Sequence, residues 1–191
     1  MEFTLSTKIQ EKRELRFLLL QAGAAILAAE GLAGLSLRAV TRRAGVSPTA
    51  AYRYFADREH MLAAIATAGV WQLTASLEAA DRAGAKPLQA QAASYVSFAA
   101  ANPALYRLIF GPERLAHYPE LESALDAAYG VLAARVAKTV PPGQAADKTL
   151  ACWCMVHGLA SLAIDSRLPQ DAGTPEALAA RLAGTINPEI L

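Results

Sequence analysis

The stretch from Leu35 to Leu62 constrains the fold more than any other part of the chain. Ser36 is a residue type that caps helix N-termini, because its hydroxyl can accept a bond from a backbone N–H of the first turn. Apolar residues then recur at helical spacing as far as Ala44. Gly45 follows at the position where many helices end in a left-handed residue. The pattern therefore predicts a helix over 37–44 that ends in a tight turn.

A second helix and the start of a third follow at once. Ser47 is a second cap residue, and Pro48 suits the first helical position, where its missing N–H costs nothing. The spacing predicts a helix over 48–55, and Asp57 is the expected cap of the next helix, which opens at Arg58. Two helices around a Gly turn, the second rich in Thr, Tyr and Arg, form the arrangement of a DNA-reading helix-turn-helix.

Residues 8 to 62 resemble, without a gap, the DNA-binding domain of TetR-family transcriptional regulators. Five matching segments carry the resemblance in chain order: Ala29-Glu30-Gly31, Leu35-Ser36-Leu37-Arg38, Ala44-Gly45-Val46-Ser47-Pro48, Tyr52-Arg53-Tyr54-Phe55 and Asp57-Arg58-Glu59. Ala51 departs from the pattern, because the family usually has Leu before the Tyr. This departure removes one apolar contact and leaves the pattern readable.

The composition favours an all-α protein, because Ala is abundant and no long stretch alternates between apolar and polar residues. We expect a three-helix helix-turn-helix head on a larger helical body, with about nine helices in all. They are predicted over residues 7–29, 37–44, 48–55, 58–81, 87–101, 104–110, 119–139, 146–166 and 175–186. Asn102 and Thr174 are expected caps. Residues 1–57 would form the DNA-binding domain, and residues 58–191 the effector-binding and dimerisation domain.

The charge distribution fits DNA binding by one end of the molecule. Between Lys8 and His60, nine Lys or Arg residues stand against five acids, whereas from Met61 onward nine basic residues face eleven acids. A basic head on a slightly acidic body suits binding to phosphates through the head. The basic side chains at the start of the first helix, such as Lys12, could reach phosphates or could be plain solubilising surface.

The resemblance implies a set of DNA-binding residues in the head. Tyr52, Tyr54 and Arg58 match positions that bind phosphates in the family, and Thr49 and Arg53 are expected to contact base edges in the major groove. The alternative for Tyr52 is packing against the first helix, and Phe55 is expected in the core. The full predicted set is Ser36, Arg38, Arg42, Arg43, Thr49, Tyr52, Arg53, Tyr54 and Arg58.

A second resemblance concerns the body. Residues 153–160 resemble the Trp-x-x-x-His-Gly pattern of one subgroup of TetR-family C-terminal domains, and residues 102–111 resemble its short helix. In the family, the fourth to seventh helices enclose an effector cavity, although plain core packing is the alternative for each aromatic residue there. The predicted lining is Trp71, Tyr95, Phe98, Tyr106, Phe110 and Tyr129. The predicted dimer interface, on the last two helices, is Trp153, His157, Ser161, Ile164, Leu178 and Leu182.

Neither a cofactor nor a metal is expected. Cys154 and His157 share a helix face and could seed a metal site, but two ligands do not complete one. Cys152 and Cys154 point to different faces and fit a reducing cytoplasm, so we expect a cytoplasmic protein. Residues 17–29 are interpreted as the first helix, not a signal peptide, and no apolar run is expected to reach the roughly 20 residues of a membrane span.

The resemblance thus implies a ligand-responsive, homodimeric DNA-binding regulator that is not an enzyme. It would act as a repressor, released from a near-palindromic operator by a small hydrophobic effector, since no charge cluster suggests a charged one. No Gly-x-Ser-x-Gly, His-Glu-x-x-His or phosphate-cradling Gly loop is present in the sequence. The alternatives are a helical adaptor without DNA binding and a metal-dependent enzyme that uses Cys154 and His157.

Overall fold

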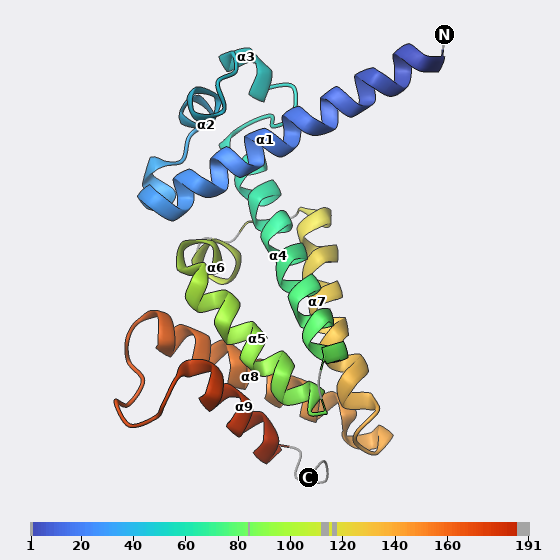
Figure 1. Cartoon of the computed structure of the whole chain (residues 1–191), viewed down its shortest axis with the longest axis vertical. Coiled ribbons are helices and arrows are strands. Elements are labelled where there is room, and N and C mark those ends of the chain that lie inside the picture. Colours follow the sequence, from blue (N-terminus) through green and yellow to red (C-terminus); the bar gives the residue numbers. More distant parts are fainter. Residues whose placement is uncertain (1, 84, 112–114, 116–117, 187–191) are drawn as a thin grey trace. The chain divides into compact units, whose positions relative to one another are not determined.

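A computed structural model describes residues 2–83, 85–111, 115 and 118–186, and the regular secondary structure of these residues is helical (Figure 1). This confirms the all-α prediction. The nine α-helices of the described residues are α1 (Glu2–Gly34), α2 (Leu37–Ala44), α3 (Pro48–Ala51), α4 (Arg58–Ala83), α5 (Pro87–Ala101), α6 (Pro103–Phe110), α7 (Pro119–Ala137), α8 (Ala145–Ile164) and α9 (Pro175–Ile186). A short 3₁₀ helix, η1 (Pro142–Gln144), precedes α8.

The chain divides into two compact units. The head unit comprises Met1–Ala68 and Ala104–Tyr118, and the body unit comprises Gly69–Pro103 and Pro119–Leu191. The long helix α4 contributes its first part to the head unit and its second part to the body unit. The boundary predicted between the two domains, after residue 57, coincides with the start of α4. The two compact units of the structure instead divide within α4, between Ala68 and Gly69.

The head unit is built on α1, which packs against α2, while α2 packs against α3. Close approach is possible because residue 23 is a glycine. A Cβ placed on Gly23 would lie 2.6 Å from Cδ1 of Ile65 on α4 and 3.7 Å from Cγ2 of Val40 on α2. The buried side chains of these helices form the core of this unit, and they include Leu19, Ile26, Leu27, Val40, Ala51, Phe55 and Met61.

The bounds of α1 differ from the predicted 7–29. Helical backbone begins at Glu2, because no Gly or Pro interrupts the residues before Thr7. At the other end, Gly31 has a φ of 68° and a ψ of −169°, so the regular helix breaks there and helical backbone then resumes up to Gly34. Only glycine adopts this combination readily, which explains why the chain changes direction at this residue.

Two local predictions around α3 were wrong. The helix predicted over 48–55 ends at Ala51, and turns follow as far as Tyr54, although the N–H groups of Tyr54 and Phe55 still bond to the Ala51 carbonyl, both at 2.9 Å. The Ser47 hydroxyl makes no capping bond to the backbone of α3, and its oxygen lies 3.2 Å from that of Thr49.

A third correction concerns Asn102, which was expected to cap the helix after it. Its side-chain amide instead donates to the Phe98 carbonyl at 2.9 Å, so it closes the end of α5. Thr174 caps α9 as predicted, because its hydroxyl accepts the Ala177 N–H at 3.2 Å. Residue 103 is already helical, so α6 begins one residue earlier than predicted, and the structure confirms the predicted bounds of α5 and α9.

In the body unit, α5 packs against α7, α8 and α9, and α8 also contacts α7 and α9. The remaining bounds deviate from prediction by one or two residues: α4 ends at 83, α7 ends at 137, and α8 covers 145–164. Such shifts are expected at helix ends, where the last backbone groups have no partners inside the helix. Because α5 packs against α7, α8 and α9, its buried side chains form much of the interior of this unit.

The expectation that no apolar run is long enough for a membrane span was wrong. Residues Gln10–Gly34 form a helical stretch of 25 residues with a mean hydropathy of 1.6 in its most apolar window. Length and composition alone would allow this stretch to cross a bilayer. A core helix of a folded domain and a signal sequence pass the same test. In the structure 28% of the apolar window is buried, and Leu19, Ile26 and Leu27 are among the buried residues of the stretch.

Candidate DNA interface and body cavity

Local hydrogen bonds fix both ends of α2, and those at its C-terminal end define the turn to α3. The Ser36 hydroxyl accepts the Ala39 N–H at 3.1 Å, as the cap prediction required. At the other end Gly45 is left-handed, with a φ of 68° and a ψ of 27°, and the Val46 N–H bonds to the Thr41 carbonyl at 3.0 Å. This is the pattern of a Schellman C-cap, and it sets the direction in which α3 leaves the turn.

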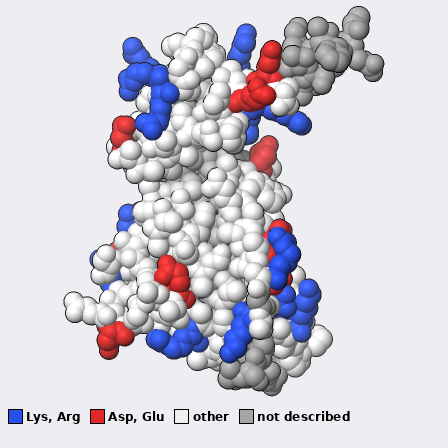
Figure 2. All heavy atoms as spheres, in the orientation of Figure 1, with Lys and Arg blue, Asp and Glu red and all other residues white. Residues whose placement is uncertain are grey.

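The predicted base-reading and phosphate-binding side chains mostly stand free of the core. Tyr52 is 62% exposed, so the alternative in which it packs against the first helix was wrong. Tyr54 is half-buried, with its ring centroid 6.4 Å from that of the buried Phe55. The other exposed members of the set are Ser36, Arg38, Arg42, Arg43, Thr49, Arg53 and Arg58. Figure 2 shows Lys and Arg side chains around α2 and α3 and along α1.

An open hollow of about 560 Å³ lies between α1 and the turns after α3. Lys12 of α1 and Arg53 both line it, together with Glu11, Leu15 and Tyr54. Two cationic side chains at one solvent-filled hollow suit a phosphate better than an apolar ligand. Lys12 was one of several equivalent surface residues in the sequence, and only the fold brings it beside Arg53.

Arg58 has a role that the sequence did not reveal. Its Nε donates to the Leu35 carbonyl at 2.8 Å, and its Nη2 donates to the Leu32 carbonyl at 2.7 Å. The guanidinium therefore ties the start of α4 to the last turn of α1 and to the segment between α1 and α2. Whether Arg58 also touches phosphate stays a prediction, but its observed bonds are those of a residue that positions the helix-turn-helix.

Asp57 caps α4 as predicted. Its Oδ1 accepts the His60 N–H at 2.9 Å and lies 3.0 Å from the His60 Nδ1. The bond from the His60 backbone lowers the pKa of the Asp57 carboxyl, because it favours the charged form. The negative carboxylate also suits the positive end of the helix dipole.

The predicted effector-lining residues do not gather in one place. Tyr95 lines a cavity in the body unit, whereas Trp71 is 48% exposed and Phe98 is half-buried outside that lining. Tyr106 and Phe110 belong to the head unit, where their ring centroids are 5.1 Å apart. Tyr129 packs edge-on against Trp153 with centroids 5.4 Å apart.

The body cavity is small and mainly apolar. About 20 Å³ of it is open to a water-sized sphere, which is enough for about one water molecule. The lining consists of Leu77, Leu88, Gln91, Ala92, Tyr95, Leu132, Cys152, Trp153, Met155, Val156 and Ala183.

An aromatic and imidazole cluster borders this cavity. His157 Nδ1 lies 3.0 Å from the Trp153 carbonyl, which can only accept, so Nδ1 carries the proton of the neutral ring. His157 Nε2, 3.0 Å from the Tyr95 oxygen, then accepts the phenol O–H. The rings of Trp153 and His157 are 4.4 Å apart between centroids. Trp153 and His157, predicted at the dimer interface, thus have well-defined partners within the chain.

His157 makes the free energy of unfolding depend on pH. Burial lowers the pKa of its imidazole below 6.5, because the charged form is desolvated in the folded state. The unfolded chain binds the proton more tightly, so stability is full above pH 6.5 and falls as the pH drops through that value. The midpoint of thermal unfolding should therefore fall between about pH 7.5 and about pH 5.5, and His157→Gln should flatten this slope. An equally steep slope in the variant would contradict the assignment.

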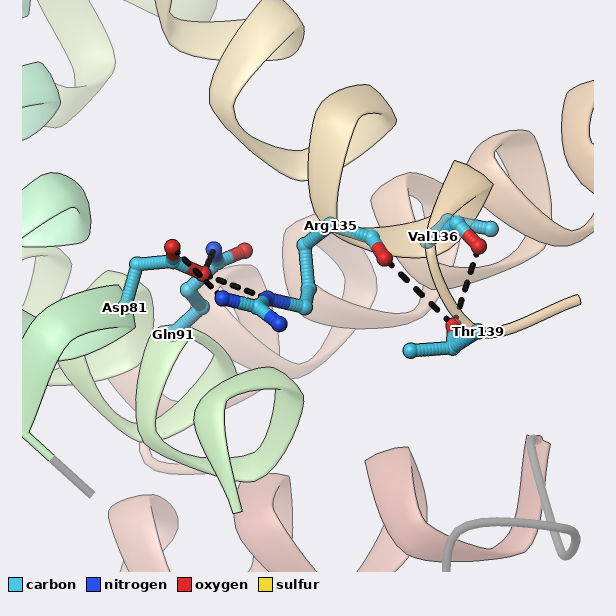
Figure 3. A network of polar contacts seen from close by, with 5 residues as sticks. All are labelled: Asp81, Gln91, Arg135, Val136 and Thr139. Carbon is cyan, nitrogen blue, oxygen red and sulfur yellow. Dashed lines mark hydrogen bonds and ion pairs between the residues drawn. The ribbon is translucent and has the colours of Figure 1, made fainter. Parts of the chain in front are cut away.

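A polar network in the body unit joins three helices (Figure 3). Arg135 on α7 donates from Nε and Nη2 to the two oxygens of Asp81 on α4, at 2.7 and 2.8 Å. Gln91 on α5 donates from Nε2 to Asp81 Oδ1 at 2.7 Å. The Arg135 bonds lower the pKa of the Asp81 carboxyl, because they stabilise its charged form. Sequence reasoning missed this network, although isolated charges in apolar helices were a signal.

The remaining predicted dimer residues lie on α8 and α9. Ser161 is exposed, Ile164 and Leu182 are half-buried, and Leu178 is buried within the chain. Two large apolar side chains of α8 that were not in the predicted set, Leu150 and Leu162, are 54% and 43% exposed in the single chain.

The structure offers no metal centre within its described residues, since no three His, Cys, Asp or Glu side chains gather there. Cys154 is exposed, and Cys152 is buried beside the cavity. Burial raises the pKa of the Cys152 thiol, which keeps it protonated and unreactive.

Comparison with known proteins agrees with this geometry. The profile described as "Bacterial regulatory proteins, tetR family" matches residues 19–65, and the one described as "Tetracyclin repressor-like, C-terminal domain" matches residues 88–186. A protein of unknown function from Rhodococcus sp. RHA1 has a similar structure, with 31% identity over 90% of this chain and 93% of its own, and a TM-score of 0.78.

Two TetR-family regulators of known structure share the fold at lower identity. The one from Marinobacter aquaeolei is 19% identical over 93% of this chain and 97% of its own, with a TM-score of 0.65. PfmR from Thermus thermophilus is also 19% identical, over 89% of this chain and 97% of its own, with a TM-score of 0.64. Members of this family are transcription factors and not enzymes. The chain therefore belongs to the TetR family of DNA-binding transcriptional regulators.

Proposed function

We propose that this regulator is a homodimeric repressor that a small hydrophobic effector releases from a near-palindromic operator. The observation that supports DNA binding is a set of exposed side chains on α3 and the turns after it, directly after Gly45 in the chain. Thr49, Tyr52 and Arg53 project there without burial, and Lys12 lines the same hollow as Arg53. Thr49 and Arg53 would contact base edges, while Tyr52 and Lys12 would contact phosphates.

Arg53 makes a guanine in each half-site the expected partner, because a guanidinium can bond to both acceptors of guanine in the major groove. Two heads related by a two-fold axis would reach successive major grooves, about 34–36 Å apart. Arg42 and Arg43, in the last turn of α2, would lie near the major groove. Ser36 and Arg38, at the start of α2, would contact the phosphate backbone of the DNA. The regulator would work in the cytoplasm, where it meets the chromosome.

The proposed dimer forms through α8 and α9. Its support is the exposure of two large apolar side chains of α8 in the single chain, Leu150 and Leu162, together with the small exposed residue Ser161 on the same helix. Burying large exposed side chains of this kind drives association, and small residues let a partner helix approach closely. Ile164, Leu178 and Leu182 would extend this interface, with Trp153 and His157 at its inner edge.

The proposed effector site is the body cavity, and its apolar lining favours a hydrophobic compound. The cavity is lined by Leu77 of α4, and α4 begins with the residues that position the helix-turn-helix. A compound that widened the cavity would move α4 and change the spacing of the two heads. Such coupling between two sites is typically about 1–3 kcal/mol.

The test of this proposal is binding of the purified protein to fragments of its own upstream DNA. The measurement is made at two salt concentrations, with nonspecific competitor, and sedimentation gives the number of chains per fragment. We expect specific, salt-sensitive retention of a near-palindromic fragment by two chains, and weaker retention when an apolar effector is added. If neither upstream fragments nor randomised DNA is retained specifically, the adaptor alternative replaces the repressor.

A further inference from the structure

Gln91 is a buried polar side chain whose amide nitrogen has a hydrogen-bond partner and whose amide oxygen has none among the described residues. It lies on α5, is 3% exposed and lines the body cavity. Its Nε2 donates to Asp81 Oδ1 at 2.7 Å, but its Oε1 is buried and has no hydrogen-bond partner among the described residues. Buried polar atoms in folded proteins almost always have a partner, so this oxygen requires an explanation.

The orientation of the Gln91 amide is determined by its neighbours. Asp81 receives two bonds from the Arg135 guanidinium and is held as a carboxylate, which can only accept hydrogen bonds. The NH₂ of Gln91 must therefore face Asp81, because the reverse orientation would set two acceptors against each other. The carbonyl oxygen is consequently the free end, and it is an acceptor that requires a donor.

We propose that the body cavity binds a small, mainly apolar molecule with a single O–H or N–H donor, and that Gln91 Oε1 accepts this donor. The inference rests on the proposed function in taking this cavity as the effector site. The rest of the lining selects the same class of ligand, since it offers aliphatic and aromatic walls and no carboxylate or ammonium group. Alcohols, phenols and amides meet these requirements, whereas anions do not, because an acceptor oxygen repels them.

Binding requires the cavity to widen, because only about 20 Å³ is open to a water-sized sphere now. Met155 is among the lining residues, and an unbranched thioether side chain adapts its shape at little cost. The same Gln91 amide would then join the ligand to Asp81 on α4, two residues from the end of that helix. The Gln91 side chain would thus take part both in ligand recognition and in a hydrogen bond between α5 and α4.

The experiment compares p-cresol with anisole, which are isomers that differ in whether the oxygen carries a hydrogen. Dissociation constants for the full chain are measured by NMR titration, with the Gln91 side-chain amide signals as the local reporter. We expect p-cresol to bind about five- to tenfold more tightly, since anisole leaves the Gln91 oxygen without a donor. We also expect the Gln91 amide signals to shift with p-cresol.

Two matched variants test the residue itself. Gln91→Met should bind both isomers equally, while Gln89→Met should keep the preference, because Gln89 also has a buried, unpartnered Oε1 but does not line the cavity. The inference would be overturned if the unmodified protein bound the two isomers with equal affinity, or bound neither at millimolar concentration. Because this comparison uses the unmodified protein, it remains valid even if a variant fails to fold. DNA affinity that stays unchanged while p-cresol binds with the expected preference would count against the repressor mechanism and support the ligand site.

Discussion

Replacing Phe55 with Ala should lower the free energy of unfolding by about 3–5 kcal/mol, the usual cost of removing a large aromatic side chain from a core. Phe55 is 2% exposed, and its N–H bonds to the Ala51 carbonyl at 2.9 Å, so its ring anchors the turns that carry Tyr52 and Arg53. A loss of this size is a large part of the stability of an ordinary domain. DNA binding should be lost with it, because the base-reading side chains no longer have a defined direction.

The measurement is urea-induced unfolding together with DNA-binding titration. Phe17→Ala is the matched control, since Phe17 is 59% exposed on α1 and its removal should change stability by no more than about 0.5 kcal/mol. A cost for Phe55→Ala as small as that of the control would show that the ring is not part of the core that supports the helix-turn-helix.

The double variant Tyr52→Ala, Arg53→Ala should weaken specific DNA binding by about 100-fold and leave the stability of the protein nearly unchanged. Both side chains are exposed, so few packing contacts are removed. A base-contacting Arg contributes about 1–3 kcal/mol to specific binding, and its removal also relaxes the preference at the base pair it reads. Each lost phosphate contact should in addition lower the salt dependence of log K by about 0.9.

The measurement is fluorescence anisotropy with labelled operator DNA over a range of salt concentrations. Arg82→Ala provides a charge-matched control, because it removes one exposed positive charge from the body unit and should leave both affinity and salt slope almost unchanged. If the double variant and this control lost affinity equally, only the total charge of the protein would matter, and the assignment of Tyr52 and Arg53 to the DNA face would fail.

The helix-turn-helix was predictable because its signals are local. Ser36, Gly45 and Asp57 act through hydrogen bonds or backbone angles within a few residues of themselves, and all three have the predicted conformation or bond. The error at α3 has a physical reason too. The N–H groups of Tyr54 and Phe55 still bond to the Ala51 carbonyl and that of Arg53 bonds to the Ala50 carbonyl, but the backbone from Tyr52 to Tyr54 forms turns and no longer a regular helix before the buried Phe55.

The candidate sites were predictable only in part, because long-range contacts leave little trace in a single sequence. Nothing near Arg58 in the sequence indicates that its guanidinium bonds to carbonyls 23 and 26 residues earlier. The residues of the body cavity were equally hard to predict, because aromatic residues on several helices look equivalent in the sequence. Of the six predicted effector residues, Tyr95 is the one that lines this cavity, and the part of all six in effector binding stays a prediction.

The sequence by itself determined the helical class and, in the head, the caps at Ser36 and Asp57 and the turn at Gly45, since these depend on propensities and on bonds between near neighbours. The tertiary structure alone decided which groups meet across helices. Asp81, Gln91 and Arg135 come from three helices and become one network, and Gln91 acquires its buried, unpartnered oxygen only when α4, α5 and α7 have packed. Burial and partner choice are properties of the packed chain, because they depend on residues far apart along it.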